Sequence, residues 1–114
     1  MAVEPLASGL FRVAEQPWFW EGFGYDDLVE LRKTGSDKFE FVRVVERSSL
    51  VRNCWVVGKE TAESQGLQAL FDDVSNAGGY WERAFGGAVF IAVPVGSKIK
   101  PEERMNEITS QSDP

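Results

Sequence analysis

The stretch Leu67 to Val93, LQALFDDVSNAGGYWERAFGGAVFIAV, decides the fold class. Its first part repeats apolar residues at the spacing of one helix face: Leu67, Leu70, Phe71 and Val74. Gly78 and Gly79 should end this helix, because glycine readily takes the left-handed conformation found just past a helix. The remainder predicts a strand at 80–84, a glycine-rich turn and a nearly all-apolar strand at 88–93.

The chain before this stretch has the pattern of strands, and the chain after it that of a short helix. Strands are predicted at 9–13, 27–32, 38–47 and 50–57, and the last helix begins at Pro101. Strands grouped before a helix are typical of an α+β fold. We therefore predict a mostly antiparallel sheet of about six strands, one main helix and a short C-terminal helix. The first half could curl into a barrel-like sheet, and the second resembles a split β-α-β unit.

The length of the chain, 114 residues, fits one domain. Aromatic residues make up 12% of it, which is enough for a real core. We predict a single α+β domain over residues 1–109 and a polar tail over 110–114. The helix stripe should face the sheet, with Phe71 at its centre.

The balance of charge is acidic, with a formal net charge of −6. Such a chain repels phosphate backbones and anionic lipid surfaces, so neither nucleic acid nor a membrane is an expected partner. It suits a basic protein partner instead. The longest apolar run, 88–95, is too short to cross a bilayer. With one cysteine and no basic-apolar leader pattern, the predicted location is cytoplasmic.

Catalytic and metal-binding patterns are missing from the sequence. There is no histidine, which excludes Ser-His-Asp and Cys-His arrangements within this chain. One cysteine and no histidine leave no zinc site, so we predict no metal, no cofactor and no catalytic residue. The acidic pairs at 26–27, 72–73 and 102–103 are interpreted as capping and solvated residues. Cys54, within a strand, is expected to be buried and unreactive.

The segment Pro17 to Tyr25, PWFWEGFGY, is the most unusual feature. Few loops carry so much ring area unless they cover a core or bind something. Two readings stay open, a plug at the end of the sheet and a partly exposed surface that contacts a partner or ligand. The predicted contact residues are Trp18, Trp20, Phe23 and Tyr25.

Arginines in the strands form a second candidate site. Arg43 occupies an apolar strand face, and Arg52 lies in the next strand, across an expected hairpin at Ser48-Ser49. Across such a hairpin Arg52 could pair with Glu46. Alternatively, Arg43 and Arg52 could together bind an acidic ligand.

The chain from about Gly9 to Ile108 resembles a family of small bacterial proteins that carries only a "domain of unknown function" label. The resemblance rests on Pro17-Trp18-Phe19, on 24–30, on Arg43 and Arg52, on Gly78-Gly79 and on Val93-Pro94. At 24–30 the family shows Gly-x-Asp-hydrophobic-hydrophobic-Glu, and this chain has Gly-Tyr-Asp-Asp-Leu-Val-Glu. The resemblance implies an α+β fold and carries over no catalytic residue.

Binding is thus predicted over catalysis. The leading hypothesis is a small acidic module that docks a protein partner, by analogy an immunity- or antitoxin-like protein. The alternative is a small-ligand-binding protein or enzyme that uses carboxylates with Arg43 and Arg52 near the aromatic segment. A structural subunit of a homo-oligomer is the third reading.

Overall fold

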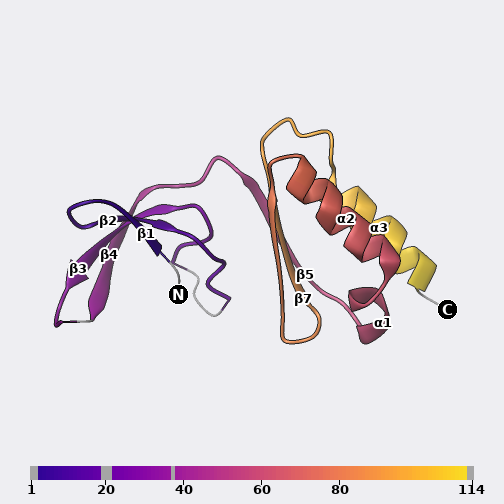
Figure 1. Cartoon of the computed structure of the whole chain (residues 1–114), viewed down its shortest axis with the longest axis horizontal. Coiled ribbons are helices and arrows are strands. Elements are labelled where there is room, and N and C mark those ends of the chain that lie inside the picture. The colour runs from indigo at the N-terminus through magenta and orange to yellow at the C-terminus, as the bar shows by residue number, and fades with distance from the viewer. Residues whose placement is uncertain (1–2, 19–21, 37, 113–114) are drawn as a thin grey trace. The chain divides into compact units, whose positions relative to one another are not determined.

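A computed structural model describes the chain at residues 3–18, 22–36 and 38–112 (Figure 1). The fold is α+β, with two antiparallel sheets of four and three strands and three helices among the described residues. Its internal contacts group the chain into two compact units, Met1–Ser49 and Leu50–Pro114. They are called the N-terminal and C-terminal units below. The sequence led us to expect a single domain over 1–109.

The N-terminal unit is a meander of four antiparallel strands in the order β1-β2-β3-β4. The strands are β1 (Val3–Ala7), β2 (Leu10–Val13), β3 (Leu28–Lys33) and β4 (Phe39–Glu46). The predictions of β2, β3 and β4 are confirmed to within one or two residues. β1 was missed, because its sequence holds a proline and too few alternating apolar residues. Among the described residues β1 and β4 do not pair with each other, so the sheet is open and not a closed barrel.

The core of the N-terminal unit is small and lies on one face of this sheet. Val13 and Val29 are fully buried, and Phe23 reaches them from the connection between β2 and β3. The ring of Phe23 stacks on Phe41 at a centroid distance of 5.1 Å. The face that alternates with the core carries charge, including Arg43, whose Nε donates to Glu30 Oε1 at 2.8 Å.

Two bulges disturb the outer strand β4. Glu30 pairs with Arg43 and Leu31 with Phe41, so Val42 has no partner in β3 and is an extra residue. Leu28 pairs with Glu46 and Val29 with Val44, so Val45 is a second extra residue. Both valines are exposed. Bulges interrupt the regular ladder of an edge strand and make it a poor template for another chain. The exposed valines of β4 therefore do not mark it as a pairing edge.

The C-terminal unit combines a three-stranded sheet with helices. Its elements are β5 (Val51–Val56), α1 (Lys59–Ala62), α2 (Gln65–Asn76), β6 (Tyr80–Ala84), β7 (Ala88–Val93) and α3 (Pro101–Ser112). The strand order is β5-β7-β6, and both outer strands run antiparallel to β7. β5 and β6 are therefore parallel to each other with β7 between them, which confirms the predicted split β-α-β unit.

The main helix α2 ends as the sequence predicts, just before Gly78 and Gly79. Ser64 caps it, its Oγ accepting from the Leu67 N–H at 3.1 Å. Past its end, the Gly79 N–H donates to the Val74 carbonyl at 2.8 Å. A Cβ on Gly79 would lie 2.6 Å from the Ala92 carbonyl oxygen, so the strand β7 passes too close for a side chain there.

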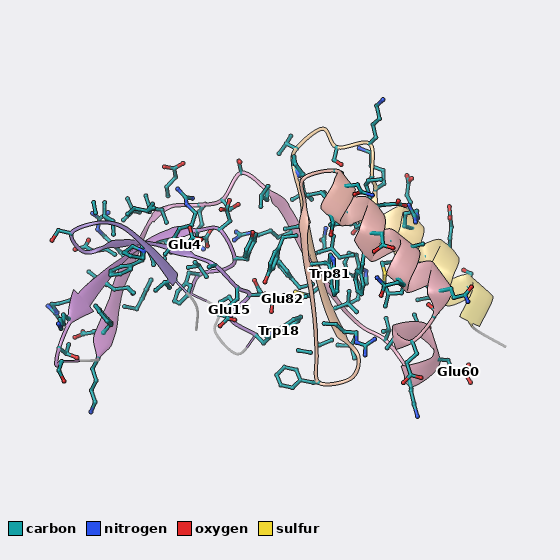
Figure 2. All side chains as sticks on the ribbon, viewed as in Figure 1. Glu4, Glu15, Trp18, Glu60, Trp81 and Glu82 are labelled. Atoms are coloured by element: carbon teal, nitrogen blue, oxygen red, sulfur yellow. The ribbon has the colours of Figure 1, made fainter. Side chains whose placement is uncertain are left out.

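The core of the C-terminal unit lies between α2, α3 and the facing side chains of β7. The whole predicted stripe of α2 is buried, and Phe71 stacks on Trp81 with ring centroids 4.0 Å apart. Figure 1 shows α2 and α3 side by side, and Figure 2 shows Trp81 of β6 directed toward them. The prediction that Phe71 faces the sheet is confirmed.

Helix α3 is longer than expected. It begins at Pro101 as predicted and continues to Ser112, so 110–112 belong to the helix and not to a polar tail. Its apolar face is thin, but Met105 and Ile108 are both buried in the core. Those two contacts anchor the helix although the rest of its surface is polar.

The expected hairpin at Ser48-Ser49 is wrong. β4 pairs with β3, and β5 pairs with β7, so the two strands belong to different sheets. Glu46 and Arg52 therefore do not face each other across a shared ladder. The Ser48 N–H is instead bound by the Asp27 carboxylate, at 2.7 Å, which turns the chain away at the end of β4.

Candidate functional site

The predicted aromatic contact residues belong to the connection between β2 and β3. Trp18 and Tyr25 are half-buried, and Trp20 lies outside the described residues. Phe23 is 8% exposed and is a core residue of the N-terminal unit. Phe23 therefore fits the interpretation as a core plug, because the surface of its ring is already buried against residues of the N-terminal unit. Trp18 and Tyr25 stay predicted contacts.

The two arginines of the second predicted site lie in different units. Arg43, in β4, is exposed and forms an ion pair with Glu30 on the charged face of its sheet. Arg52, in β5, is half-buried. A role in binding an acidic ligand stays a prediction for each.

The turn before β3 contains a buried carboxylate. Asp27 is 0% exposed, and both of its oxygens accept hydrogen bonds. Oδ2 accepts from the Gly24 N–H at 2.8 Å and from Arg47 Nη1 at 3.4 Å, and Oδ1 accepts from the Ser48 N–H. The interpretation of this acidic pair as capping the turn is confirmed for Asp27.

Asp26, next to Asp27, has a positive φ of 70°. Its conformation is held by the Val13 carbonyl, which accepts its N–H at 2.8 Å, and by Arg12 Nη1, which donates to its carbonyl at 2.9 Å. A cavity of about 110 Å³ opens beside it. The lining residues are Glu4, Arg12, Val13, Ala14, Tyr25 and Asp26. Tyr25 thus joins a small polar cavity within the N-terminal unit.

The tip of the hairpin between β6 and β7 presents an exposed ring. Phe85 is 70% exposed and has a φ of 54°, and Gly86 after it has a φ of 82°. Two successive positive φ values are typical of tight hairpin turns, whose first position favours Asn, Asp or Gly. A bulky side chain in this conformation is uncommon, because its Cβ crowds the backbone. The conformational preference of the turn therefore does not explain the phenylalanine.

A second exposed apolar residue lies at the same end of the sheet. Val56, the last residue of β5, is 91% exposed and pairs in register with Ala88, the first residue of β7. The following Val57 N–H donates to the Gly87 carbonyl at 2.8 Å. A Cβ on Gly87 would lie 2.2 Å from the Val57 carbonyl oxygen, so only glycine allows this approach. The tip surface, defined as Val56 and Phe85, is thus built on a fixed turn.

The opposite end of β5 borders a cavity of about 180 Å³. Its lining residues are Val51, Asn53, Lys100, Pro101, Glu102 and Glu103. Val51 and Asn53 alternate along β5 and share the face of Trp55, which packs against the helix side. The cavity therefore lies between the outer strand and the beginning of α3, and is called the β5–α3 cavity below.

Cys54 is exposed, and the expectation that it is buried is wrong. The register of β5 turns Trp55 toward the helices, so the neighbouring Cys54 lies on the other face of an outer strand. Partial burial raises the pKa of the Cys54 thiol, because a thiolate is less well solvated there. The thiol is thus reachable but less ionised at neutral pH than a free cysteine.

Sequence reasoning missed the tip surface and the β5–α3 cavity. The signal for the first was present, because Phe85 precedes two glycines where a turn residue is expected. The cavity has no local signal, since it joins residues almost 50 positions apart. Within the described residues, no group of three or more His, Cys, Asp or Glu side chains could hold a metal ion. In the same part of the chain, no helix has the length and apolarity that a membrane span requires.

Comparison with known proteins adds a likeness of fold. No protein-family model matches the chain, and no curated protein matches it. Among solved structures, it is similar to a hypothetical protein from Neisseria gonorrhoeae, with a TM-score of 0.60 and 14% sequence identity. The match covers 95% of this chain and 72% of that one. At such low identity the likeness concerns the fold alone.

Proposed function

We propose that this chain is a small protein-interaction module that docks a basic protein partner through its C-terminal unit. The observation that carries the proposal is Phe85, a bulky ring held at positive φ and left 70% exposed. A backbone in a sparsely populated region costs on the order of 1–3 kcal/mol and persists where the surroundings hold it, most often at functional positions. An exposed ring there is a natural anchor for a partner.

The second apolar residue of the tip surface supports the same reading. Val56 is 91% exposed, and burying such a side chain contributes about 1.5–3 kcal/mol. Together with Phe85 it offers an apolar contact at one end of a rigid sheet. The net charge of −6 favours a partner of opposite charge and would speed their encounter.

The size, acidity and predicted cytoplasmic location fit an immunity- or antitoxin-like role, in which the chain neutralises a basic protein. That narrower role rests on analogy in size and charge. The half-buried Trp18 and Tyr25 are further candidate contacts in the N-terminal unit. The competing explanation is that the tip surface contacts a second copy of the chain in a homo-oligomer.

The test uses variants that favour the turn and remove the ring. Phe85→Asn suits the positive φ, so the free energy of unfolding should stay equal or rise by up to about 1 kcal/mol. The combined variant Phe85→Asn with Val56→Ser should recover far less partner in affinity capture from native cells. Val95→Ser, which changes another exposed valine of this unit, is the matched control.

The recovered partner is then purified, and its affinity is measured by calorimetry. A stable tip variant that binds about tenfold or more weakly, with Val95→Ser unchanged, supports the proposal. Equal affinity of the tip variant and the native chain would overturn it. A partner that proves to be a second copy of the chain would replace it with the oligomer reading.

Small-ligand binding is the second candidate, and the cavity beside Asp26 favours it. The two carboxylates of Glu4 and Asp26 outnumber the one guanidinium of Arg12, which lies 3.9 Å from Asp26 Oδ1. Together with the ring of Tyr25, this excess of negative charge suits a small organic cation. Guanidinium added to labelled protein should shift the amide resonances of residues 12–14 and 24–26 in a saturable way. Shifts spread evenly over the chain would exclude this site.

A further inference from the structure

The strand β5 forms one edge of the three-stranded sheet. β5 lies at one end of the order β5-β7-β6, and no strand among the described residues pairs on its other side. At the opposite end of the sheet, Arg83 of β6 donates to the Ala62 carbonyl and ties α1 to that edge. An edge strand presents N–H and C=O groups that another extended segment can bind. Such a segment would fit β5 rather than β6.

Exposed side chains occur at both ends and in the middle of β5, whereas Arg52, Asn53 and Trp55 are half-buried. Val51 at its beginning and Val56 at its end are 44% and 91% exposed, and Cys54 between them is exposed. Unlike β4 in the N-terminal unit, β5 pairs in an unbroken register with its neighbour, from Val51 opposite Val93 to Val56 opposite Ala88. It lacks the bulges that blunt β4. A regular, exposed edge is the geometry that strand addition requires.

The β5–α3 cavity lies beside this edge and supplies a pocket for one side chain. Val51 and Asn53 come from alternate positions of the strand, and the rest of the lining comes from Lys100 and the first residues of α3. In strand addition, backbone hydrogen bonds give affinity, and pockets for alternate side chains give specificity. Strand edge and pocket therefore occur together on the same element.

The charges of the cavity select the side chain it can hold. Glu102 and Glu103 bring two carboxylates against the single ammonium of Lys100, and all three are exposed. Val51 and Pro101 provide an apolar wall for an aliphatic stem. An arginine combines such a stem with a planar fork of donors that matches a carboxylate. The excess of negative charge on the whole chain acts in the same direction.

We propose that β5 binds an extended basic segment of the partner by strand addition, with an arginine of that segment in the β5–α3 cavity. This inference rests on the proposed function, in which the C-terminal unit docks a basic partner. The tip surface then lies at the far end of the same strand. A segment matched to the six residues of β5 would extend about 20 Å, at roughly 3.3 Å per residue.

A synthetic probe tests the inference without the natural partner. The probe is an end-blocked, fluorescein-labelled peptide of about eight residues, alternating valine and arginine, the length of a short strand. Its affinity is measured by anisotropy at near-physiological salt, where non-specific attraction is screened. The variant Glu102→Gln with Glu103→Gln should bind it about tenfold more weakly.

The matched control removes two negative charges from glutamates outside the cavity. Glu60→Gln with Glu107→Gln changes two exposed glutamates of helices in the same unit, outside the cavity (Figure 2 labels Glu60). This control should bind the probe within about threefold of the native chain, because long-range attraction alone is reduced. An equal loss in both variants, or no loss in either, would overturn the inference.

A second probe tests strand addition itself. N-methylation of alternate peptide bonds removes the donors needed for a ladder, so this peptide should bind at least about tenfold more weakly. Saturating unmodified peptide should also slow alkylation of Cys54, which lies on β5, whereas the methylated peptide should not. Equal affinity of both peptides, or unchanged Cys54 alkylation under saturation, would contradict binding at this edge.

The two proposals can fail separately. A natural partner that needs Phe85, together with a peptide insensitive to Glu102 and Glu103, keeps the proposed function and removes strand addition. The opposite result is also possible. If the peptide needs Glu102 and Glu103 and loses affinity on N-methylation, while the tip variant keeps full affinity for the partner, strand addition stands and the tip surface is not an anchor.

Discussion

The two units of the chain reach a stable structure by different means. The C-terminal unit covers one face of its sheet with helices and buries a cluster of nine apolar residues there. The N-terminal unit has no helix among its described residues, and its buried apolar cluster holds three. In this unit the buried Asp27 instead connects the segment before β3 with the segment after β4, by accepting from the Gly24 and Ser48 N–H groups. Apolar packing therefore dominates the C-terminal unit, whereas the N-terminal unit depends more on a fixed hydrogen-bond network.

The largest expected effect is the loss of a core ring in the C-terminal unit. Phe71→Ala removes a buried side chain stacked on Trp81, and should lower the free energy of unfolding by about 3–5 kcal/mol. Urea unfolding followed by tryptophan fluorescence measures it. Val95→Ala, at a 73% exposed site in the same unit, is the control and should change little. A loss below about 1 kcal/mol would show that packing does not dominate this unit.

The network of the N-terminal unit predicts a somewhat smaller loss. In Asp27→Asn one amide N–H must face a donor, either the Gly24 or the Ser48 N–H, because both oxygens of Asp27 accept. Burying such a conflict should lower the free energy of unfolding by about 2–3 kcal/mol. Amide hydrogen exchange in β3 and β4 is the measurement, since it reports on this unit separately.

Asp26, next to Asp27 in the chain, provides the matched control. Asp26→Asn should cost less than about 0.5 kcal/mol, because asparagine tolerates positive φ and the Ser48 hydroxyl can reverse its role toward an amide. If Asp26→Asn and Asp27→Asn destabilised the unit equally, the network would not depend on the buried carboxylate, and the contrast between the units would weaken.

The smallest effect concerns reactivity and not stability. Cys54 should react with a water-soluble alkylating reagent in the folded protein, because it is exposed on β5. Its pKa is raised by partial burial, so the rate should level off at a higher pH when folded than in urea. A folded rate that levels off at the same or a lower pH would contradict this environment. Complete protection would mean that β5 is covered.

Much of the fold follows from the sequence, and the reasons are local. The stripe from Leu67 to Val74, its Ser64 cap and its glycine end each carry a signal within a few residues. β7 is nearly all apolar because it is the central strand. The length of α3 was underestimated, because only Met105 and Ile108 reveal its packing.

The wrong predictions concern features that depend on residues far apart in the sequence, or on strand register, and not on the local pattern. Ser48-Ser49 looks like a hairpin turn, but Asp27, distant in sequence, binds Ser48 and directs the chain elsewhere. The side on which Cys54 lies depends on strand register, which a one-residue shift would reverse. The β5–α3 cavity forms only when α3 returns to the beginning of β5. Candidate sites of this kind depend on tertiary placement and leave no mark in any short stretch.

The most direct test of the account is amide hydrogen exchange across the chain, with and without the partner recovered by capture. Binding should slow exchange in β5 and around the hairpin tip at Phe85, with little change in β1 to β4. Protection confined to the N-terminal unit, while the amides of β5 and the tip exchange as they do in the free protein, would show that the partner does not bind at β5 or at the tip surface.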